Sequence, residues 1–295
     1  MPFTLATFNV KDYFDSPRNA PVLAEKAAEI ARHVTRADAD VVALQEIGSE
    51  ALVRAMLVHV PFGVKYTVIF GGADHRGIGN ALLSRLPIVE SETVVCPNLP
   101  FPVFRVGDPA PFPGRLFLRR PVVRMSVDTL GMRVSVFSTH WKSKLPKPEE
   151  DPNGVEKRWE GGSGRAEADL RSLLSRGAEA LFVRRLVERF AVEGEVVVAG
   201  DLNDTIDSIP VKIVRGVGEA HELYPAAEKA PPEARVSTLH RGMKEQIDHV
   251  LATASLHERL TRSEFFNDAL RDHPFDPDAS PTTDSDHAML VAVYG

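Results

Sequence analysis

The sequence is poor in cysteine, with Cys96 the single one in 295 residues. A disulfide needs a pair of cysteines and thiolate metal sites use several, so both are excluded within this chain. Cys96 stands between Val95 and Pro97, where no base could activate its thiol. We therefore expect Cys96 to be a structural residue, in line with the frequent burial of free thiols.

Long apolar runs are also missing. No segment approaches the roughly 20 apolar residues that a membrane-spanning helix needs, so no membrane insertion is expected. The start, MPFTLATFNV, lacks the basic, apolar and small-residue regions of a secretory signal. These features predict a cytoplasmic protein, with secretion as the alternative if the N-terminus is that of a trimmed mature form.

Basic residues are outnumbered. Lys and Arg total 35 against 41 Asp and Glu, which gives a net charge of −6. This balance counts against a protein that binds DNA by non-specific charge alone. It counts less against an enzyme whose acidic residues surround a cation, because the metal supplies local positive charge.

Hydrophobic residues make up 43% of the chain, enough for a sizeable core. No internal repeat or linker divides the sequence, and we expect a single domain over 1–295. Apolar periodicity and turn signals predict the elements. Strands are expected at 3–10, 41–44, 64–70, 79–84, 88–95, 116–127, 132–140, 195–200 and 288–293, and helices at 21–36, 50–58 and 166–190. Strands joined partly by helices and partly by hairpins predict an α/β fold of two mixed β-sheets packed face to face, with helices outside.

Three segments resist this pattern. Residues 96–115 are rich in Pro, Gly and Phe and predict an irregular surface loop. Residues 141–165 show no period and predict a mobile loop, which we take as the expected specificity element. The last third alternates short strands with loops and includes an Asp- and Pro-rich stretch at 272–286.

Polar residues recur where the apolar strands end or begin. They are Asn9, Glu46, His140, Asp201, Asn203, Asp248, His249, Asp286 and His287. A single acid at a strand end is often only a solvated cap or a turn former. The whole set, however, offers oxygen ligands, a base and two histidines on a rigid scaffold. Carboxylates and an amide suit Mg²⁺ or Mn²⁺, with Ca²⁺ as a third option, rather than zinc.

These residues lie in motifs that resemble, in order, those of the endonuclease/exonuclease/phosphatase superfamily, which includes pancreatic-type deoxyribonuclease. The motifs are TFNV (7–10), LQEI (44–47), GNALLSR (79–85), STHWKSK (138–144), AGDLND (199–204), QIDHVL (246–251) and SDHAML (285–290). The series spans about residues 4 to 294. The resemblance implies a four-layered α/β sandwich and a metal-dependent hydrolase of phosphate esters.

The resemblance also implies roles for individual residues. Glu46 would be the main metal ligand, and Asn9 and Asp286 would complete or support the shell. Asp201 would hold and deprotonate the attacking water, and Asn203 would orient that water or a phosphate oxygen. An Asp can act as such a base where its surroundings raise its pKa.

Two histidines complete the implied machinery. His287 would bind the scissile phosphate, with its ring fixed by Asp248, because a carboxylate selects one tautomer and favours the charged imidazole. His140 resembles a second histidine of the deoxyribonuclease branch, where it helps to protonate the leaving oxygen. Its presence argues against the abasic-site repair branch.

Further residues are candidates for secondary phosphate contacts. Arg76 and Asn80 flank a turn, and Lys142 and Lys144 follow His140, where cations would attract phosphates. Each is equally interpretable as an ordinary surface side chain. Trp141 could stack on a base or simply pack in the core.

We favour a nuclease acting on nucleic acid, because TFNVKDYFD (7–15) resembles the start of a bacterial nuclease type. The alternative is a phosphatase or phosphodiesterase acting on small or lipid phosphate esters. An inactive phosphate-binding module is a third interpretation, which would predict a broken site. The sequence predicts no obligate protein partner and leaves DNA versus RNA, endo- versus exonucleolytic action and oligomeric state open.

Overall fold

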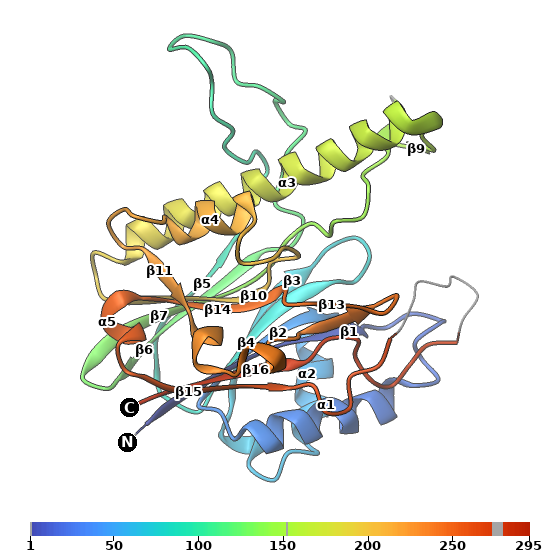
Figure 1. Cartoon of the computed structure of the whole chain (residues 1–295). Helices are drawn as coiled ribbons and strands as arrows, with labels where there is room; N and C mark the ends of the chain where they lie inside the picture. Colours follow the sequence, from blue (N-terminus) through green and yellow to red (C-terminus); the bar gives the residue numbers. More distant parts are fainter. Residues whose placement is uncertain (1, 152, 273–279) are drawn as a thin grey trace.

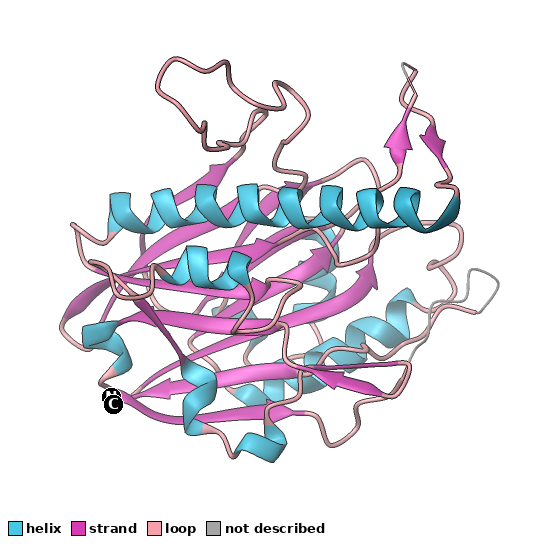
Figure 2. Ribbon diagram, turned by 45° about the horizontal axis from the view of Figure 1, so that its top comes forward, coloured by secondary structure: helices cyan, strands magenta, loops and turns pink. Residues whose placement is uncertain are grey.

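The computed structural model describes residues 2–151, 153–272 and 280–295. Two six-stranded β-sheets pack face to face, and helices cover both outer surfaces (Figures 1 and 2). This arrangement confirms the predicted four-layered α/β sandwich.

The first sheet has the strand order β15-β16-β1-β2-β4-β3. Strands β1 and β2 run parallel, and the other neighbours are antiparallel. Its strands are β1 (Phe3–Tyr13), β2 (Val41–Ile47), β3 (Thr67–Ala73), β4 (Gly79–Ser84), β15 (Leu260–Phe266) and β16 (Met289–Tyr294).

The second sheet has the order β11-β14-β10-β7-β6-β5, with β7 and β10 parallel. Its strands are β5 (Ile88–Val94), β6 (Val122–Thr129), β7 (Met132–His140), β10 (Glu195–Asp201), β11 (Leu223–Pro225) and β14 (Asp248–Thr253). Two small hairpins form separate two-stranded sheets, β8 (Glu149–Glu150) with β9 (Glu156–Lys157) and β12 (Thr238–His240) with β13 (Met243–Glu245).

The helices form the outer layers. Helices α1 (Leu23–Ala37) and α2 (Glu50–Leu57) cover the first sheet, whereas α3 (Gly161–Phe190) and α4 (Ile209–Arg215) cover the second (Figure 1). The short helix α5 (Ala254–His257) and the 3-10 turns η1 (Gly63–Lys65), η2 (Ala226–Lys229) and η3 (Pro232–Ala234) complete the described elements. Among the described residues, no helix combines the length and apolarity that crossing a bilayer requires.

Alternation along the strands explains the three apolar layers. In β1, Phe3 and Leu5 face the second sheet, while Ala6 and Phe8 pack under α1. Since both faces of such strands are covered, they read as unbroken apolar runs, as in VVAL at 41–44.

The inner face turns polar toward the ends of the parallel strands. In β1 the inward alternation continues from Leu5 through Thr7 to Asn9. Just below the rim, the Gln45 amide accepts from Thr7 Oγ1 at 3.3 Å and donates to Ser138 Oγ at 3.2 Å, across the two sheets. The same inward alternation therefore places polar side chains at one mouth of the sandwich.

Several predicted boundaries were wrong. The strand expected at 116–127 begins at Val122, because Leu116 and Leu118 instead pack in the outer layer with α3. The 141–165 loop contains the β8–β9 hairpin, and α3 begins within it at Gly161. Helix α4 was not predicted. The stretch at 272–286 lies partly outside the described residues.

Candidate active site

Both sheets contribute to one cluster of polar side chains at this mouth. Asn9 lies in β1 at the last regular pair with β2, Glu46 is the penultimate residue of β2, and Asp201 is the last residue of β10 in the second sheet. The Asn9 amide nitrogen donates to Glu46 Oε1 at 3.2 Å and to Asp201 Oδ2 at 3.0 Å. Residues far apart in sequence are thus joined through a single buried amide.

Backbone geometry presents Glu46 to the cluster. Glu46 has a φ of +65°, where few residues other than glycine and asparagine are found. Its second oxygen, Oε2, accepts from the backbone N–H of Asp12 at 2.8 Å. That N–H is available because Lys11 and Asp12, both with φ near +52°, interrupt the ladder after Asn9. Such strained positions concentrate at functional sites.

Asp201 is almost completely buried. Glycine at 200 allows the close approach of β10 to β7, since a Cβ there would collide with the Thr139 carbonyl. Asn203 donates to Asp201 from its backbone N–H (2.8 Å to Oδ1) and from its amide (3.1 Å to Oδ2). Burial and the charge of Asp248 raise the pKa of Asp201 to about 7.

His287 forms a tight pair with Asp248. Its Nδ1 lies 2.7 Å from Asp248 Oδ2, and its Nε2 lies 4.0 Å from Asp201 Oδ2. Burial disfavours the charged imidazole, but Asp248, by charge and hydrogen bond, and then Asp201 outweigh it and hold the pKa of His287 well above its usual range. The ring is therefore cationic at neutral pH, with Nε2 directed toward the cluster.

His140 differs from His287 in charge. Its Nε2 lies 3.4 Å from Asp201 Oδ2 and 3.9 Å from Glu46 Oε1. Burial, and then the charges of Arg120 and His287, lower the pKa of His140 well below its usual range. His140 is therefore neutral at neutral pH and fits the site as a hydrogen-bond donor.

Asp286 faces the cluster from the loop before β16. Its Oδ2 accepts from Lys11 Nζ at 3.2 Å. Burial raises the pKa of Asp286, but the charges of His287 and Lys11 exceed that effect and bring it below its usual value. Asp286 is thus an ionised carboxylate beside the other acids.

A buried lysine holds the loop that carries Asp286 and His287. Lys26 of α1 is 2% exposed, and its Nζ donates to the backbone carbonyls of Thr282, Thr283 and Asp284 at 3.2–3.5 Å. These carbonyls immediately precede Ser285, whose Oγ donates to Asn9 O at 2.7 Å. Lys26 therefore ties the loop to α1, and Ser285 ties it to β1.

We expect Lys26→Met to lower stability by about 2 kcal/mol, because the loop loses hydrogen bonds from a charged donor. We also expect kcat to fall about tenfold, since small displacements of reacting groups are costly. Thermal melts and steady-state assays measure both effects. Lys212→Met, on the exposed side of α4, is the matched control and should change stability by less than about 0.5 kcal/mol. Equal behaviour of the two variants would contradict this role for Lys26.

The four residues that were predicted to contact phosphate lie in different surroundings. Asn80 is buried beside Gln45 and donates to Pro121 O at 2.8 Å. Arg76 pairs with Asp74 at 3.1 Å, although its charge still acts on His140. Lys142 Nζ turns to Ser143 and to the Leu145 carbonyl, and Lys144 pairs with Glu245 at 2.5 Å. The structure thus places Asn80 opposite Gln45, next to Glu46 in β2, and engages the three cations in local contacts.

Sequence reasoning did not identify Lys11, Lys26 or Arg120 as parts of the site. Buried Arg120 donates to His140 O at 3.0 Å and to Trp141 O at 2.7 Å, which fixes the end of β7. A usable signal existed for Lys26, because it shares the apolar face of its helix with Ile30, four residues on. Trp141 is fully buried, so it packs in the core and cannot stack on a base.

The cluster fits a divalent cation by its chemistry. Glu46, Asp201 and Asp286 supply carboxylate oxygens, which are ligands that Mg²⁺, Mn²⁺ and Ca²⁺ accept. Asn9 supports these carboxylates: its amide nitrogen donates to Glu46 and Asp201, and its oxygen accepts from the Lys11 backbone N–H at 2.9 Å. Crowding of these acids has a cost: burial and the charge of Glu46 raise the pKa of Asp12 to about 6. A cation among them would offset this repulsion.

A second grouping, Asp201, Asp248 and His287, also has its ligand atoms within 4.8 Å of one another. In that group, however, the ring of His287 is cationic, so both of its nitrogens carry protons and neither offers a lone pair to a metal. The oxygen-rich set around Glu46 is therefore the better candidate metal site, and the histidine pair is better suited to contact substrate.

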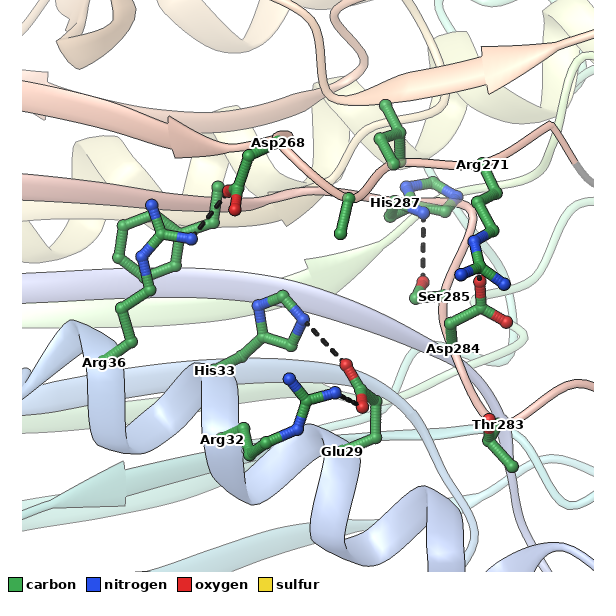
Figure 3. Close-up of a pocket in the computed structure, with 13 residues that line it drawn as sticks. Glu29, Arg32, His33, Arg36, Asp268, Arg271, Thr283, Asp284, Ser285 and His287 are labelled. Carbon is green, nitrogen blue, oxygen red and sulfur yellow. Dashed lines mark hydrogen bonds and ion pairs between the residues drawn. The ribbon is translucent and has the colours of Figure 1, made fainter.

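A cavity of about 240 Å³ lies on the other side of His287, against α1 (Figure 3). Its charged side chains are paired with one another: Arg36 with Asp268 at 2.6 Å, Arg271 with Asp284 at 3.9 Å, and Glu29 with Arg32. The cavity thus offers compensated charges and no excess of cations among its described residues.

Comparison with known proteins agrees with this architecture. The truncated TDP2 of Caenorhabditis elegans superposes with a TM-score of 0.62 at 14% identity, covering 100% of this chain and 98% of that one. TDP2 of D. rerio complexed with a single-strand DNA product gives 0.61 at 16%, covering 100% and 99%. A family protein of Bacteroides thetaiotaomicron gives 0.62 at 16%, covering 99% and 97%. These likenesses show a shared fold.

No curated protein matches the chain by sequence. The model of the Endonuclease/Exonuclease/phosphatase family matches residues 6–287, which is nearly the whole chain. Taken with the fold and the polar cluster, this match confirms the resemblance carried by the motifs. The chain belongs to the endonuclease/exonuclease/phosphatase family, whose members hydrolyse phosphate esters.

Proposed function

We propose that this protein is a divalent-metal-dependent phosphodiesterase that cleaves nucleic acid. The observation that carries the proposal is a buried carboxylate of raised pKa, Asp201, placed 4.0 Å from a cationic His287. A base and a cation side by side are what hydrolysis of a phosphodiester by water requires.

In the proposed mechanism, Glu46 and Asp286 would hold the cation with the support of Asn9, and the cation would supply positive charge to the phosphate. Asp201 takes a proton from the attacking water as the water oxygen bonds to phosphorus. Asn203, already bonded to Asp201, orients that water or a phosphate oxygen.

His287 donates from Nε2 to a non-bridging phosphate oxygen, on which charge builds as the ester bond to the leaving oxygen breaks. Asp248 positions the ring of His287 and keeps it charged. Because His140 is neutral, we propose that its Nε2 donates a hydrogen bond to the leaving oxygen. It does not transfer a proton to that oxygen as an imidazolium would.

Nucleic acid is the favoured substrate because the D. rerio TDP2 of the same fold is complexed with single-strand DNA. A second candidate is a lipid phosphodiester. It is favoured by Phe104 and Val106, which are fully exposed on the loop between β5 and β6 that projects from the molecule (Figure 1). Release of headgroup from phospholipid vesicles, with no cleavage of DNA, would select this candidate.

Supercoiled plasmid DNA tests the proposal. We expect nicking with Mg²⁺ or Mn²⁺ and its complete loss with EDTA, because the acidic cluster needs the cation to neutralise the phosphate. Asp201→Ala with metal present is the control for a contaminating nuclease and should also leave the plasmid intact. Nicking that persists in EDTA would refute metal dependence, and an intact plasmid with both metals would refute the nuclease.

A further inference from the structure

A small hollow lies beside the candidate active site, under the projecting loop. It is formed by residues of the β5–β6 loop, by the segment that follows β7 and by α3. Four cationic side chains line it: Arg115, Arg119, Lys142 and Lys147. Lys142 comes two residues after His140, and Arg119 precedes Arg120, which binds the His140 carbonyl at 3.0 Å. Two of the lining residues are therefore held close to His140 by the chain and by Arg120.

Positive charge in the hollow is poorly compensated. Glu179 is the sole carboxylate among its described lining residues, is 2% exposed, and accepts from the Lys142 backbone N–H at 2.7 Å. Within the described part of the chain, no carboxylate forms an ion pair with Arg115, Arg119 or Lys147. The cavity behind His287, with its internally paired charges, is unlike it in this respect.

The lysines respond to this crowding. Burial, and then the charge of Arg119, lower the pKa of Lys142 to about 8 and bring the pKa of Lys147 below its usual value. Since the protein as a whole is acidic, an unpaired group of cations at this place is not a general feature of its surface. A bound anion would relieve the repulsion.

We propose that this hollow is a second phosphate subsite, which binds a phosphate of the substrate strand other than the one cleaved. Its volume of about 10 Å³ has room for a single oxygen-sized atom and for no base, so a phosphate would place one oxygen there and the contact would be made without regard to sequence. The subsite rests on the proposed nuclease function and makes it specific for polynucleotides over single esters.

The double variant Arg119→Gln/Lys147→Gln tests the subsite. We expect kcat/KM for a single-stranded oligonucleotide to fall about tenfold or more, while kcat/KM for bis(p-nitrophenyl) phosphate stays unchanged, because the small ester cannot reach the hollow. With EDTA present to prevent cleavage, the salt slope of oligonucleotide binding should decrease by about 1.4, as expected for two lost contacts to a single strand.

The matched control removes two positive charges at the far ends of the sheets. Arg133→Gln/Arg262→Gln breaks surface ion pairs with Asp128 and Glu264 and should leave all three measurements unchanged. Equal losses on both substrates, or a salt slope equal to that of the control, would overturn the subsite. If the wild type cleaves the small ester but not the oligonucleotide, the nuclease function fails by itself. The salt slope then decides the subsite alone: a decrease supports it, and no decrease overturns it.

Discussion

Asp201→Asn is expected to lower kcat by about 10³-fold, within the usual range for loss of a general base. Asparagine keeps the size of the side chain and can still accept from Asn9, but it cannot take a proton from water. Single-turnover cleavage of an oligonucleotide with Mg²⁺ measures the chemical step directly. A variant with more than a tenth of the wild-type rate would contradict the assignment of Asp201 as the base.

A stability measurement separates this effect from misfolding. Because the pKa of Asp201 is raised from 3.8 to about 7, the folded state binds a proton that the unfolded state releases between these values. The contribution of Asp201 to stability is present below pH 3.8 and is lost as pH rises to about 7. Asparagine does not titrate, so the stability of the variant has no such dependence on pH at this position. In EDTA, the difference in Tm, variant minus wild type, should therefore be larger at pH 8 than at pH 5, and an equal difference would refute the raised pKa.

Asp248→Asn is expected to lower kcat by about 10²–10⁴-fold at pH 8, comparable to loss of an acid or base. The amide can still accept from His287 Nδ1, so the ring keeps its place but loses the charge that holds its pKa high. His287 then becomes neutral at a lower pH, and Asp201, relieved of a neighbouring charge, ionises at a lower pH. Both limbs of the pH–kcat profile should shift toward acid.

The control for this variant is His287→Gln, which removes the imidazole altogether. It should lose a similar amount of activity at pH 8 but should not recover as the pH is lowered. Asp248→Asn, in contrast, should regain part of the loss at pH 6. If both variants have the same pH profile, Asp248 acts only as a buried structural partner.

The fold was predictable because most strands are visible in the sequence as apolar runs with polar ends. In β10, for example, Val197 and Ala199 point into the layer between the sheets, and the same alternation carries Asp201 to the mouth. In β14, Val250 and Ala252 are related to Asp248 in the same way. The acids that continue the inward-facing alternation of a strand can therefore be identified from the sequence. They locate the cluster without knowledge of the strand order.

What the sequence did not reveal depends on long-range contacts. Helix α3 begins at Gly161, although Gly161, Gly162 and Gly164 disfavour a helical first turn. Likewise, the pairing of Lys11 with Asp286 joins residues 275 positions apart, which no local pattern encodes. The charge states of His140 and His287 also differ because of their neighbours, which only the structure identifies.

Asn9 and Glu46 stand on one sheet and Asp201 on the other, and no covalent link sets the distance between these halves. That distance equals the thickness of the apolar layer, about 10 Å for packed sheets. Side chains such as Leu5, Val136 and Val197 therefore act as spacers, and their volumes adjust the gap that a cation and a phosphate would occupy in the proposed mechanism. Substitutions in the core should consequently affect catalysis as well as substitutions at the site. A methyl group gained or lost between the sheets changes the width of the site.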